Sequence, residues 1–574
     1  MNENYLNENI NQVWCSIIID QLCHNNIDNF YLAPGMRNAP LLRAASNHSK
    51  SKFESFLDER ALAYRALGFS KNGKIPALIC TSGTALANFL PAVIESYRSN
   101  QPIVVISADR PIDLVKTDAN QTIDQTSVIK NFVCDSLNLD SPCESLTPKR
   151  LRTLIQNIIN KAIRYKRPIH INVPLREPLN IEKVNISKDY DQLALESFER
   201  LNTPTNISYI SKYNHNEAIE KIINSARSPL LVVGKIEQDI EIRDLTNLLS
   251  KIDIPKYIDV TSKVKYSFPL FKKMNPSFDH PEVYKAYNNK KPDLIIHIGG
   301  RVVSKNYYKF QDENPHIRVL HVTHFDNDHD PGFSNNTKII CSIKSFLEYL
   351  SSLELSADSP IDWNDFINSK RRVIEESELS FPFISKRVIE NSLKGSHILI
   401  GNSTAIRSFD NYIDPIKEYE YKIFSNRGVS GIEGFQATLL GIYDANKDIN
   451  KPFTLIAGDV TFMHDLNSLY MLNTLKKVNI NIIVINDNGG GIFKLLPIVN
   501  DKDYIDCLTT PHNNSFEKLI AAFSNIYYTQ VSTKDDFINA YMTEQNKEHV
   551  SFIEVCIKEK TNLDVFQQLK TLKL

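Results

Sequence analysis

Two short polar segments, each following an apolar run, contain the residue types that bind a metal ion together with a diphosphate. Gly458-Asp459 follows Leu455-Ile456-Ala457, and Asn486-Asp487-Asn488-Gly489-Gly490-Gly491 follows Ile480–Ile485. Because the carboxyl ends of neighbouring parallel strands line one crevice, we expect both segments to face the same place. A carboxylate, a side-chain oxygen and a free loop carbonyl suit Mg²⁺, which is commonly shared with a phosphate, and the glycines let the backbone approach a diphosphate closely.

Either segment alone is also compatible with ordinary turn residues at a strand end. The pair is more specific, because Asp459 and Asp487 are 28 positions apart. This arrangement resembles the signature of thiamine-diphosphate enzymes, a Gly-Asp pair followed further along the chain by an Asn-Asn pair. Asn486, at a spacing of 27, is a rival to Asp487 as the second ligand, although alignment on Asn488-Gly489-Gly490 favours Asp487.

The thiamine-diphosphate resemblance also implies a distant carboxylate that hydrogen-bonds to the pyrimidine ring of the cofactor. Glu59, within Asp58-Glu59-Arg60, stands at the opening of a predicted helix in the N-terminal third of the chain. A carboxyl group there would protonate or polarise a ring nitrogen and so activate the cofactor. Read in isolation, Asp58-Glu59 is an acidic first turn favoured by the helix dipole, and the companion motifs are what favour the catalytic interpretation.

Further motifs follow one another as in a single family. The N-terminal third contains Ala33-Pro34-Gly35-Met36-Arg37-Asn38, Thr81-Ser82-Gly83-Thr84, Ser107-Ala108-Asp109-Arg110-Pro111 and Ala119-Asn120-Gln121-Thr122; the C-terminal third contains Gly401-Asn402-Ser403 through Arg407, Ser425-Asn426-Arg427-Gly428-Val429-Ser430-Gly431-Ile432-Glu433-Gly434 and His464-Asp465-Leu466-Asn467. Together these motifs resemble the 2-succinyl-5-enolpyruvyl-6-hydroxy-3-cyclohexene-1-carboxylate synthase family, thiamine-dependent enzymes of menaquinone biosynthesis. The match covers both outer thirds and is thin in the middle.

The resemblance implies that 2-oxoglutarate is decarboxylated on thiamine diphosphate and that the remaining carbanion is added to isochorismate. Both substrates are dicarboxylates, and guanidinium groups hold planar carboxylates by paired hydrogen bonds. Each arginine taken singly could instead form a surface salt bridge. The residues implied to bind substrate are Arg37, Arg110, Gln121, Lys305, Asn402, Ser403, Arg407 and Arg427; those implied to bind the cofactor are Glu59, Gly458, Asp459, Asp487, Gly489, Gly490 and Ile432; and Asp459, Asp487 and Gly489 are implied to bind Mg²⁺, with Mn²⁺ as the alternative ion.

Three positions depart from the family pattern. Met36 stands where the family has a serine beside the substrate arginine, so a hydroxyl is replaced by a larger apolar chain. Asp487 replaces the second asparagine and adds a negative charge near the diphosphate. Glu433 replaces an aspartate, which changes its reach. These departures leave two alternatives open: another thiamine-diphosphate 2-oxo acid decarboxylase or carboligase, and a catalytically silent homologue that binds a ligand.

Apolar runs alternate with amphipathic helical stretches along most of the chain, a pattern typical of parallel sheets covered on both faces. It predicts an α/β protein with three tandem α/β domains and mainly parallel sheets, and the family resemblance implies that they form the thiamine-diphosphate-binding fold. The expected domains are 1–185 (pyrimidine-binding), 186–355 (central) and 356–574 (diphosphate-binding), with a linker around 181–210. The predicted strands are Asn29–Ala33, Pro76–Thr81, Pro102–Ser107, Pro168–Val173, Leu230–Val233, Ile254–Val260, Leu294–Ile298, Val319–Val322, Ile398–Ile400, Ile423–Ser425, Phe453–Ala457, Ile480–Ile485 and Ser551–Val555, and the predicted helices in the first domain are Glu59–Lys71, Ala85–Tyr97 and Pro148–Tyr165.

Composition and charge exclude several other classes of protein. Lys and Arg total 66 against 67 Asp and Glu, so no large single-sign field would attract nucleic acid or anionic lipid. The N-terminus lacks the order of a secretory signal, and no apolar run approaches ~20 residues, so we expect a cytoplasmic protein without stable membrane insertion. The eight cysteines form no C-x-x-C pair, and no His cluster accompanies them at zinc spacing, so we expect buried thiols. By resemblance, the active form is a homodimer or a dimer of dimers.

Overall fold

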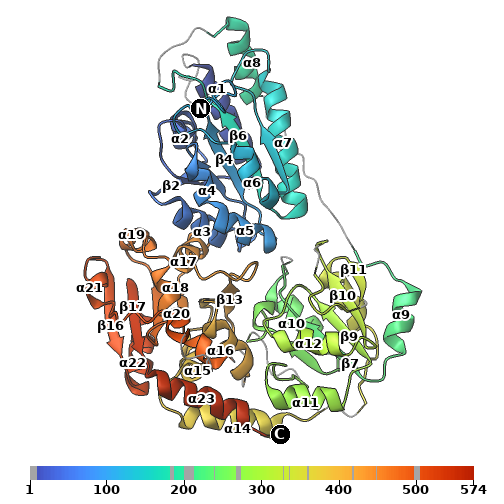
Figure 1. Cartoon of the computed structure of the whole chain (residues 1–574). Helices are drawn as coiled ribbons and strands as arrows, with labels where there is room; N and C mark the ends of the chain where they lie inside the picture. The colour runs from blue at the N-terminus through green and yellow to red at the C-terminus, as the bar shows by residue number, and fades with distance from the viewer. Residues whose placement is uncertain are drawn as a thin grey trace. The chain divides into compact units, whose positions relative to one another are not determined.

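The computed structural model describes residues 9–180, 186–199, 212–237, 240–266, 273–326, 329–334, 336–358, 361–415, 419–447, 449–496 and 504–573. Within these residues the chain forms three sheets, and every pair of neighbouring strands in them is parallel (Figure 1). The prediction of an α/β protein with three mainly parallel sheets is therefore confirmed.

The first sheet has the strand order β2-β1-β3-β4-β6-β5. Its strands are β1 (Asn29–Leu32), β2 (Lys52–Ser55), β3 (Ala77–Cys80), β4 (Val104–Asp109), β5 (Asp135–Asn138) and β6 (Ile169–Pro174). The helices around it are α1 (Ile10–His24), α2 (Ala39–Asn47), α3 (Glu59–Ser70), α4 (Thr84–Asn88), α5 (Leu90–Arg98), α6 (Gln125–Ile129), α7 (Pro148–Tyr165) and α8 (Lys188–Glu199). Helices α1, α2, α7 and α8 share one apolar core with the central strands.

The middle sheet has the order β11-β10-β9-β7-β8. Its strands are β7 (Pro229–Val233), β8 (Lys256–Ile258), β9 (Leu294–Ile298), β10 (Arg318–Thr323) and β11 (Asn336–Ile340). Two separate apolar cores flank it. One contains side chains of α9 (Glu217–Asn224), α10 (Ile242–Lys251) and α13 (Ile343–Ser351), and the other those of α11 (Pro281–Asn289), α12 (Lys305–Glu313) and α14 (Asn364–Glu376).

The third sheet has the order β13-β12-β14-β15-β17-β16. Its strands are β12 (His397–Ile400), β13 (Lys422–Ser425), β14 (Phe453–Gly458), β15 (Ile480–Asn486), β16 (Ile526–Val531) and β17 (Val550–Cys556). Its core includes α15 (Phe381–Asn391), α16 (Thr404–Tyr412), α22 (Lys534–Glu544) and α23 (Glu559–Thr571). The remaining helices are α17 (Phe435–Asp444), α18 (Asp459–Met463), α19 (Ser468–Asn473), α20 (Ile505–Thr509) and α21 (Glu517–Ile520).

The first and third sheets repeat one topology. Numbered from the first strand of each, both run in the order 2-1-3-4-6-5. In such a sheet the strand order reverses beside the first strand, and ligands bind outside the carboxyl ends of the strands at that point. Segments after β1, β3 and β4 in one sheet, and after β12, β13, β14 and β15 in the other, are therefore the places where binding residues should lie.

All thirteen predicted strands exist, but four strands were missed. They are β2, β5, β11 and β16, each of which lies at the edge of its sheet. An edge strand is covered less completely than a central one, and three residues of β2, for instance, are exposed. A polar, half-exposed sequence does not produce the continuous apolar run by which buried parallel strands are recognised.

Two helical predictions were wrong in detail. The single helix predicted over Ala85–Tyr97 is broken at Phe89, and α5 begins anew at Leu90, because Pro91 has no backbone N–H to donate to the preceding turn. The linker predicted around 181–210 contains α8, whose Tyr190 accepts a hydrogen bond from Trp14 Nε1 at 2.8 Å. Polar composition hid this helix, and the rest of the linker lies largely outside the described residues.

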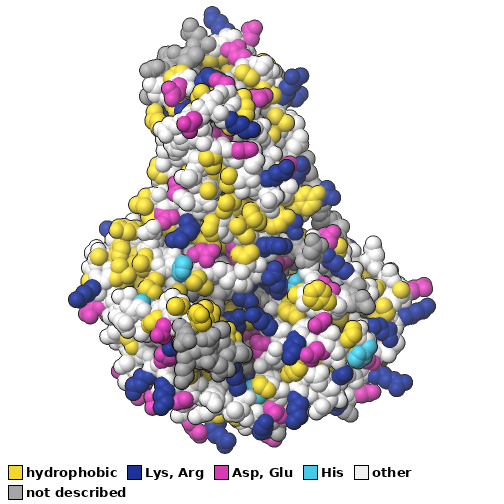
Figure 2. Space-filling model, in the orientation of Figure 1, with side chains coloured by type: hydrophobic (Ala, Val, Ile, Leu, Met, Phe, Trp, Pro, Cys, Tyr) yellow, Lys and Arg dark blue, Asp and Glu magenta, His cyan; other side chains and the backbone are white. Residues whose placement is uncertain are grey.

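The chain divides into two compact units. One comprises Met1–Tyr209 with Asn426–Asp448 and Asn467–Met471, and contains the first sheet; the other comprises Ile210–Ser425, Ile449–Leu466 and Leu472–Leu574, and contains the middle and third sheets. Acidic and basic side chains are interspersed over the face shown in Figure 2. No described helix combines the length and hydropathy needed to cross a membrane. The expectation of buried thiols holds for four cysteines, whereas Cys507 is exposed and Cys134, Cys143 and Cys556 are half-buried.

Candidate active site

The two carboxylates singled out in the C-terminal third follow neighbouring strands. Strands β14 and β15 pair over their whole length, with Gly458 opposite Ile485. Asp459 is the residue after β14 and Asp487 the residue after β15, and both side chains are buried. The two carboxylates therefore lie at one edge of the sheet, close enough for the charge of Asp459 to affect the ionisation of Asp487.

A glycine-rich loop closes over this carboxylate pair. The backbone N–H of Gly489 donates to Asp459 Oδ2 at 2.8 Å, and Gly489 has a φ of 124°. A Cβ there would lie 2.3 Å from the carbonyl oxygen of Thr509, so only glycine fits. His512 Nε2 also contacts Asp459 Oδ2, at 3.0 Å. Sequence reasoning missed His512, since it follows no motif and only the folded loop brings it to the site.

The rival ligand Asn486 is engaged elsewhere. Its side-chain amide donates to Glu554 Oε1 at 2.7 Å and to the carbonyl oxygen of Asn514 at 3.0 Å. Its Oδ1 accepts the backbone N–H of Asn488 at 3.1 Å. Asn486 thus fixes the loop against the neighbouring strand β17, while Asp487 is the residue beside Asp459.

Burial makes this pair electrostatically unfavourable without a cation. Burial raises the pKa of Asp459, while hydrogen bonds from His512, Gly489 and Val460 oppose the rise. The pKa of Asp487 is raised well above its usual value, first by burial and then by the charge of Asp459. A divalent ion would remove the repulsion between the two carboxylates, and the donor set of two carboxylates and loop carbonyls fits Mg²⁺.

Glu59 begins helix α3 in the other unit. Asp58 is the N-cap, its Oδ1 accepting from the N–H of Ala61 at 3.1 Å. Glu59 is half-buried, and its Oε2 accepts from Asn88 Nδ2 at 3.2 Å. Its charge reaches Cys80 at the end of β3. Glu59 therefore presents a carboxylate at the carboxyl edge of the first sheet, oriented by an asparagine.

Helix α3 is held against α17 by an unusually close approach of the two backbones. A Cβ on Gly68 would lie 2.0 Å from the carbonyl oxygen of Thr438, and one on Gly441 would lie 1.8 Å from that of Arg65. The Arg65 guanidinium also donates from Nε to Asp444 Oδ2 at 2.7 Å, and both side chains are buried. Glycines on both helices allow this contact, and the ion pair fixes its register.

The segment before α17 is fixed to α3 as well. The Tyr64 hydroxyl donates to Glu433 Oε1 at 2.9 Å, next to the half-buried Ile432. Asn467 donates to the Asp58 carboxylate, beside Glu59. Two residues that the sequence assigned to the cofactor, Glu59 and Ile432, therefore belong to one unit and are tied to the same helix. The glutamate that replaces the family's aspartate is the residue that makes the Tyr64 contact.

Three predicted substrate residues gather in loops at the carboxyl edge of the first sheet. Arg110, after β4, donates from Nη1 to the backbone carbonyl of Gln121 at 3.2 Å and to Ser82 Oγ. Burial and then the like charge of Arg37 lower the pKa of Arg110. Arg37, after β1, donates to the carbonyl oxygen of Leu175 at 2.8 Å, and its buried Nε has no hydrogen-bond partner within the described residues. Adjacent guanidinium groups with a spare donor are suited to an anion.

Asn402, Ser403 and Arg407 lie together in the other unit, and Lys305 lies at the start of α12, in the same unit. Ser403, after β12, has a φ of 64°, an uncommon conformation outside glycine, and its carbonyl oxygen accepts from Arg407 Nη1 at 2.9 Å. Asn402 is buried beside it. Asp279 lies between this group and the start of α12. Its Oδ1 accepts a hydrogen bond from Ser304 Oγ at 2.7 Å, and burial lowers the pKa of Arg407, which the negative charge of Asp279 opposes. Lys305 itself is exposed.

Arg427 lies in a loop that a buried carboxylate holds. Glu95 on α5, 1% exposed, accepts from the backbone N–H of Gly428 and of Val429, both at 2.7 Å. A Cβ on Gly428 would collide with Glu95. Glu95 thus sets the position of the backbone next to Arg427, and no sequence motif identified it.

Replacing Glu95 with Gln should loosen this loop, since an amide offers one acceptor where two backbone donors need two. Hydrogen bonds to charged groups contribute ~1.5–3 kcal/mol, so we expect lower stability and a weaker grip on the substrate that Arg427 contacts. Hydrogen exchange at Gly428 and Val429 should accelerate, with KM rising more than kcat falls. Unchanged exchange at these two amides would show that Glu95 does not position the loop.

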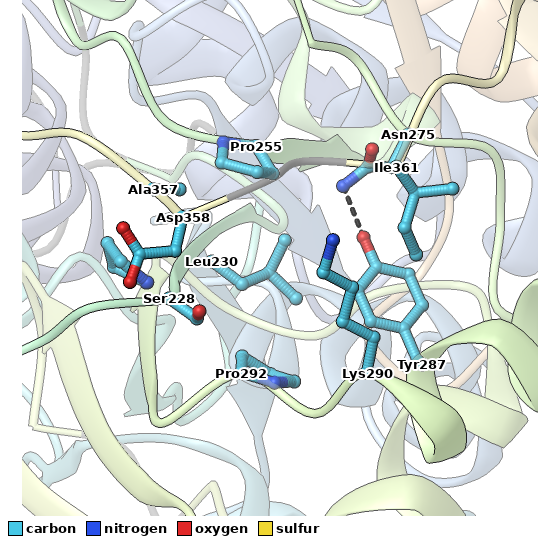
Figure 3. A pocket seen from close by; sticks show the side chains of 11 residues that line it. Ser228, Leu230, Pro255, Asn275, Tyr287, Lys290, Pro292, Ala357, Asp358 and Ile361 are labelled. Carbon is cyan, nitrogen blue, oxygen red and sulfur yellow. Dashed lines mark hydrogen bonds between the residues drawn. The ribbon is translucent and has the colours of Figure 1, made fainter.

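A small pocket in the middle domain is not part of either group of site residues. It lies at the amino end of β7 and is lined by Ser228, Leu230, Tyr287 and Lys290 among others (Figure 3). Its volume of about 40 Å³ is too small for a dicarboxylate and would hold little more than water. None of the predicted site residues lines it.

Comparisons with known proteins agree with the site chemistry. Residues 15–128 match the family "Thiamine pyrophosphate enzyme, N-terminal TPP binding domain". The structure is similar to the thiamine diphosphate-dependent 4-hydroxybenzoylformate decarboxylase of Rhodococcus jostii, with a TM-score of 0.70, 17% identity and coverage of 95% of this chain and 99% of that one. The N-terminal family match, with a fold shared by thiamine diphosphate-dependent enzymes, places the chain in the class of thiamine diphosphate-dependent enzymes.

Two relatives identify the family within that class. The chain is 32% identical to a 2-succinyl-5-enolpyruvyl-6-hydroxy-3-cyclohexene-1-carboxylate synthase of Syntrophus aciditrophicus over 99% of this chain and all of that protein. It is 31% identical to the synthase of the same name from Chlorobium phaeobacteroides, over 97% of each chain. The protein belongs to the 2-succinyl-5-enolpyruvyl-6-hydroxy-3-cyclohexene-1-carboxylate synthase family.

Proposed function

We propose that this protein is the menaquinone-pathway synthase that decarboxylates 2-oxoglutarate and adds the remaining four-carbon unit to isochorismate, with Mg²⁺ and thiamine diphosphate. The products are 2-succinyl-5-enolpyruvyl-6-hydroxy-3-cyclohexene-1-carboxylate and carbon dioxide. The observation that carries the choice of substrates is the adjacent pair of guanidinium groups on Arg37 and Arg110. Each guanidinium group can bind one carboxylate, so the pair suits a dicarboxylic substrate, which a decarboxylase of monocarboxylic 2-oxo acids does not require. Arg37 Nη2 lies 3.3 Å from Glu177 Oε1, a contact that a substrate carboxylate would replace.

The carboxylates of the chain hold the two ends of the cofactor. Asp459, Asp487 and the Gly489 carbonyl would ligate Mg²⁺ and through it the diphosphate, and the glycine loop lets backbone atoms approach phosphate oxygens. Glu59 would exchange a proton with the pyrimidine ring, with Asn88 orienting its carboxylate. Ile432 would support the bent form of the cofactor. When bound, thiamine diphosphate supplies a carbon nucleophile and an electron sink.

The substrate residues would act by positioning. Arg37 and Arg110 would bind carboxylates in bidentate fashion, with Gln121 held beside Arg110. Asn402, Ser403 and Arg407 form a second group, and Arg427 and Lys305 would complete the binding of two dicarboxylates. We further propose a homodimer in which Glu59 of one subunit serves the metal-bound cofactor of its partner. The exposed Met36, in the place of the family's serine, offers no hydroxyl to either substrate.

Arg110→Lys should raise KM for one substrate by ~10- to 100-fold, because a single ammonium loses the bidentate contact. The KM for the other substrate and the kcat should change far less, since the interaction is made in the ground state too. Steady-state kinetics with each substrate varied in turn measure this. Arg150→Lys, on the exposed side of α7, is the control and should leave both KM values unchanged.

A steady-state assay with 2-oxoglutarate, isochorismate, thiamine diphosphate and Mg²⁺ tests the proposal as a whole. Isochorismate-dependent consumption of 2-oxoglutarate with release of carbon dioxide is the expected result. Release of carbon dioxide that is indifferent to isochorismate would instead identify a simple decarboxylase. Failure to bind thiamine diphosphate with Mg²⁺ would identify a catalytically silent homologue.

A further inference from the structure

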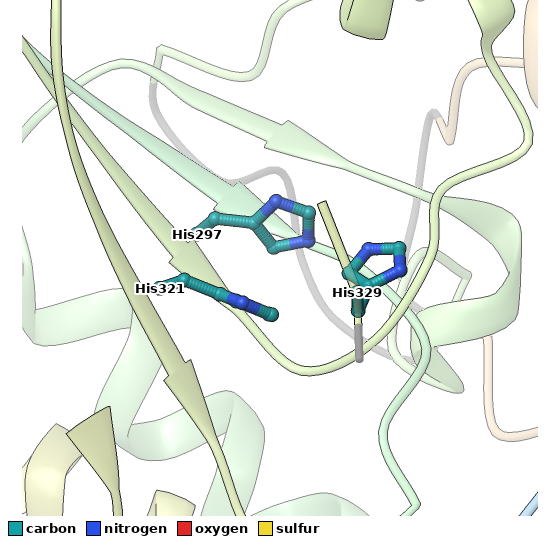
Figure 4. Close-up of side chains that lie close together, drawn as sticks. All are labelled: His297, His321 and His329. Atoms are coloured by element: carbon teal, nitrogen blue, oxygen red, sulfur yellow. The ribbon is translucent and has the colours of Figure 1, made fainter. Parts of the chain in front are cut away.

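Three histidines from the middle domain meet at the carboxyl edge of its sheet, away from the carboxylate pair in sequence and on a different sheet. His297 lies on β9, His321 lies opposite it on β10, and His329 follows β10 (Figure 4). One ring nitrogen from each lies within 4.8 Å of those of the other two. Because they are 24 and 8 positions apart, no spacing pattern indicated them, and the sequence analysis looked only for histidines that accompany the cysteines at zinc spacing.

The distances between the three histidine rings match those around a shared metal ion. The ring centroids lie 4.9 Å apart for His297 and His321, 5.3 Å for His321 and His329, and 5.9 Å for His297 and His329. Three imidazoles on a tetrahedral ion, each with its nitrogen ~2.0–2.1 Å from the metal, have ring centres about 5 Å apart. The three rings are thus almost in position before any ion binds.

The surrounding hydrogen bonds fix the orientation of the two strand histidines. His321 Nε2 donates to the carbonyl oxygen of Gly299 at 2.8 Å, which leaves Nδ1 as an acceptor. His297 Nδ1 lies 2.9 Å from the Tyr307 hydroxyl, and its Nε2 lies 2.9 Å from the carbonyl oxygen of Gly300. These contacts mean that Nε2–H donates to the Gly300 carbonyl and that Nδ1 accepts from the Tyr307 hydroxyl. To bind an ion, His297 would carry its proton on Nδ1 instead, donate it to Tyr307, and share the ion between Nε2 and the Gly300 carbonyl. Such outer contacts typically orient metal-binding histidines.

His329 adds a second, independent sign of a ligand. Its Nε2 is buried and has no hydrogen-bond partner within the described part of the chain. A buried polar atom without a partner destabilises the folded protein, so an ion that accepts its lone pair would remove this penalty. Burial lowers the pKa of all three histidines and so disfavours their protonated forms.

The charged side chains near the three histidines would not by themselves attract a cation. Arg301 and Lys338 are the cations that act on His329, and Asp330 is an anion that acts on His321. Lys338 is paired with Asp326 at 2.8 Å. Binding would therefore depend on nitrogen lone pairs, which favours a transition metal such as Zn²⁺ over Mg²⁺ or Ca²⁺.

We propose that His297, His321 and His329 form a binding site for a divalent transition metal of the zinc type, separate from the Mg²⁺ of the cofactor. The ion would hold the segment after β10 against β9 and β10. It takes no part in the proposed reaction, and its existence does not depend on that reaction.

Metal analysis of the full-length protein without a histidine tag tests the site. Excess Mg²⁺ is kept present so that the carboxylate site is filled. After chelation and dialysis, we expect one equivalent of added Zn²⁺ to bind, and Co²⁺ to give the intense visible absorption of a tetrahedral or five-coordinate site rather than the weak bands of an octahedral one. Zn²⁺ should also raise the melting temperature.

Variants separate this site from adventitious binding. His321→Asn and His329→Asn should each lose the equivalent of Zn²⁺ and the Co²⁺ bands, whereas His324→Asn, a neighbouring histidine outside the cluster, should keep both. His329 is only partly buried, so its variant remains informative even if His321→Asn fails to fold. Absence of Zn²⁺ binding by the unaltered chain, or binding that survives His329→Asn, would overturn the proposal and leave a hydrogen-bonded histidine cluster.

Discussion

Glu59→Gln should lower kcat by ~10²- to 10⁴-fold with both substrates saturating, the range that a positioned acid–base group contributes. The amide keeps the size of the side chain and can still accept from Asn88, so α3 and its N-cap should fold as before. It cannot exchange a proton with the cofactor, however, and the rate of cofactor activation should fall. Rapid-quench kinetics and proton–deuterium exchange of the bound cofactor measure both rates.

Cofactor binding distinguishes this role from a structural one. The affinity for thiamine diphosphate should change little in Glu59→Gln, and the melting temperature should match that of the unaltered protein. Co-expression with Asp459→Asn subunits tests the dimer proposal, because mixed dimers of two inactive subunits should regain activity if the residues serve one site from different subunits. Full activity of Glu59→Gln alone would refute the assignment of Glu59.

Asp459→Asn should abolish activity by preventing cofactor binding. The Asp459 carboxylate is buried and accepts hydrogen bonds from the N–H of Gly489 and from His512. In asparagine, the side-chain NH₂ could face these donors instead of an acceptor, and the negative charge that binds the ion would be lost. Loss of a direct ligand should weaken Mg²⁺ binding by more than the 10- to 100-fold typical of outer-shell partners. Calorimetric titration of Mg²⁺ with thiamine diphosphate measures the change.

Asp487→Asn is the matched control, because it introduces the asparagine that the family resemblance leads us to expect at this position. An amide oxygen can still ligate Mg²⁺, so binding and activity should persist. Since the pKa of Asp487 is raised in the folded protein, ionisation of this carboxyl destabilises the fold as pH rises above its unfolded pKa of ~3.9. Without metal, Asp487→Asn should therefore melt at a higher temperature than the unaltered protein at pH 7–8, and this advantage should vanish below pH 4. Equal loss of activity in both variants would count against Asp459 as the specific ligand.

The core strands could be predicted from sequence because each is a short run of apolar residues buried on both faces. Strands that are not buried on both faces lack this pattern and were not predicted. Edge strands such as β2 and β16 are partly exposed, and polar residues interrupt their pattern. Helix α8 was missed because most of its surface is polar and only a narrow face, including Tyr190, packs on the core.

Motif residues could be named before the structure because their chemistry requires particular types at strand ends. Asp459, Asp487 and the arginines stand in such segments. The residues that hold them in position belong to no motif: Glu95 grips the Arg427 loop, His512 contacts Asp459, and Asn88 orients Glu59. Glutamate, histidine and asparagine are common residues, so only their contacts in the folded structure identify these three as positioning residues.

The sequence by itself determined the α/β class, the cofactor class and the residues that could perform the chemistry, because short-range order is sufficient for apolar runs and glycine-rich turns. The tertiary structure decided which side chains share a site. It showed that the two outer sheets have one topology, that Asp487 rather than Asn486 lies beside Asp459, and that His297, His321 and His329 converge. Those outcomes depend on strand order and loop paths, which arise from packing across the whole domain and leave no local signal in the chain.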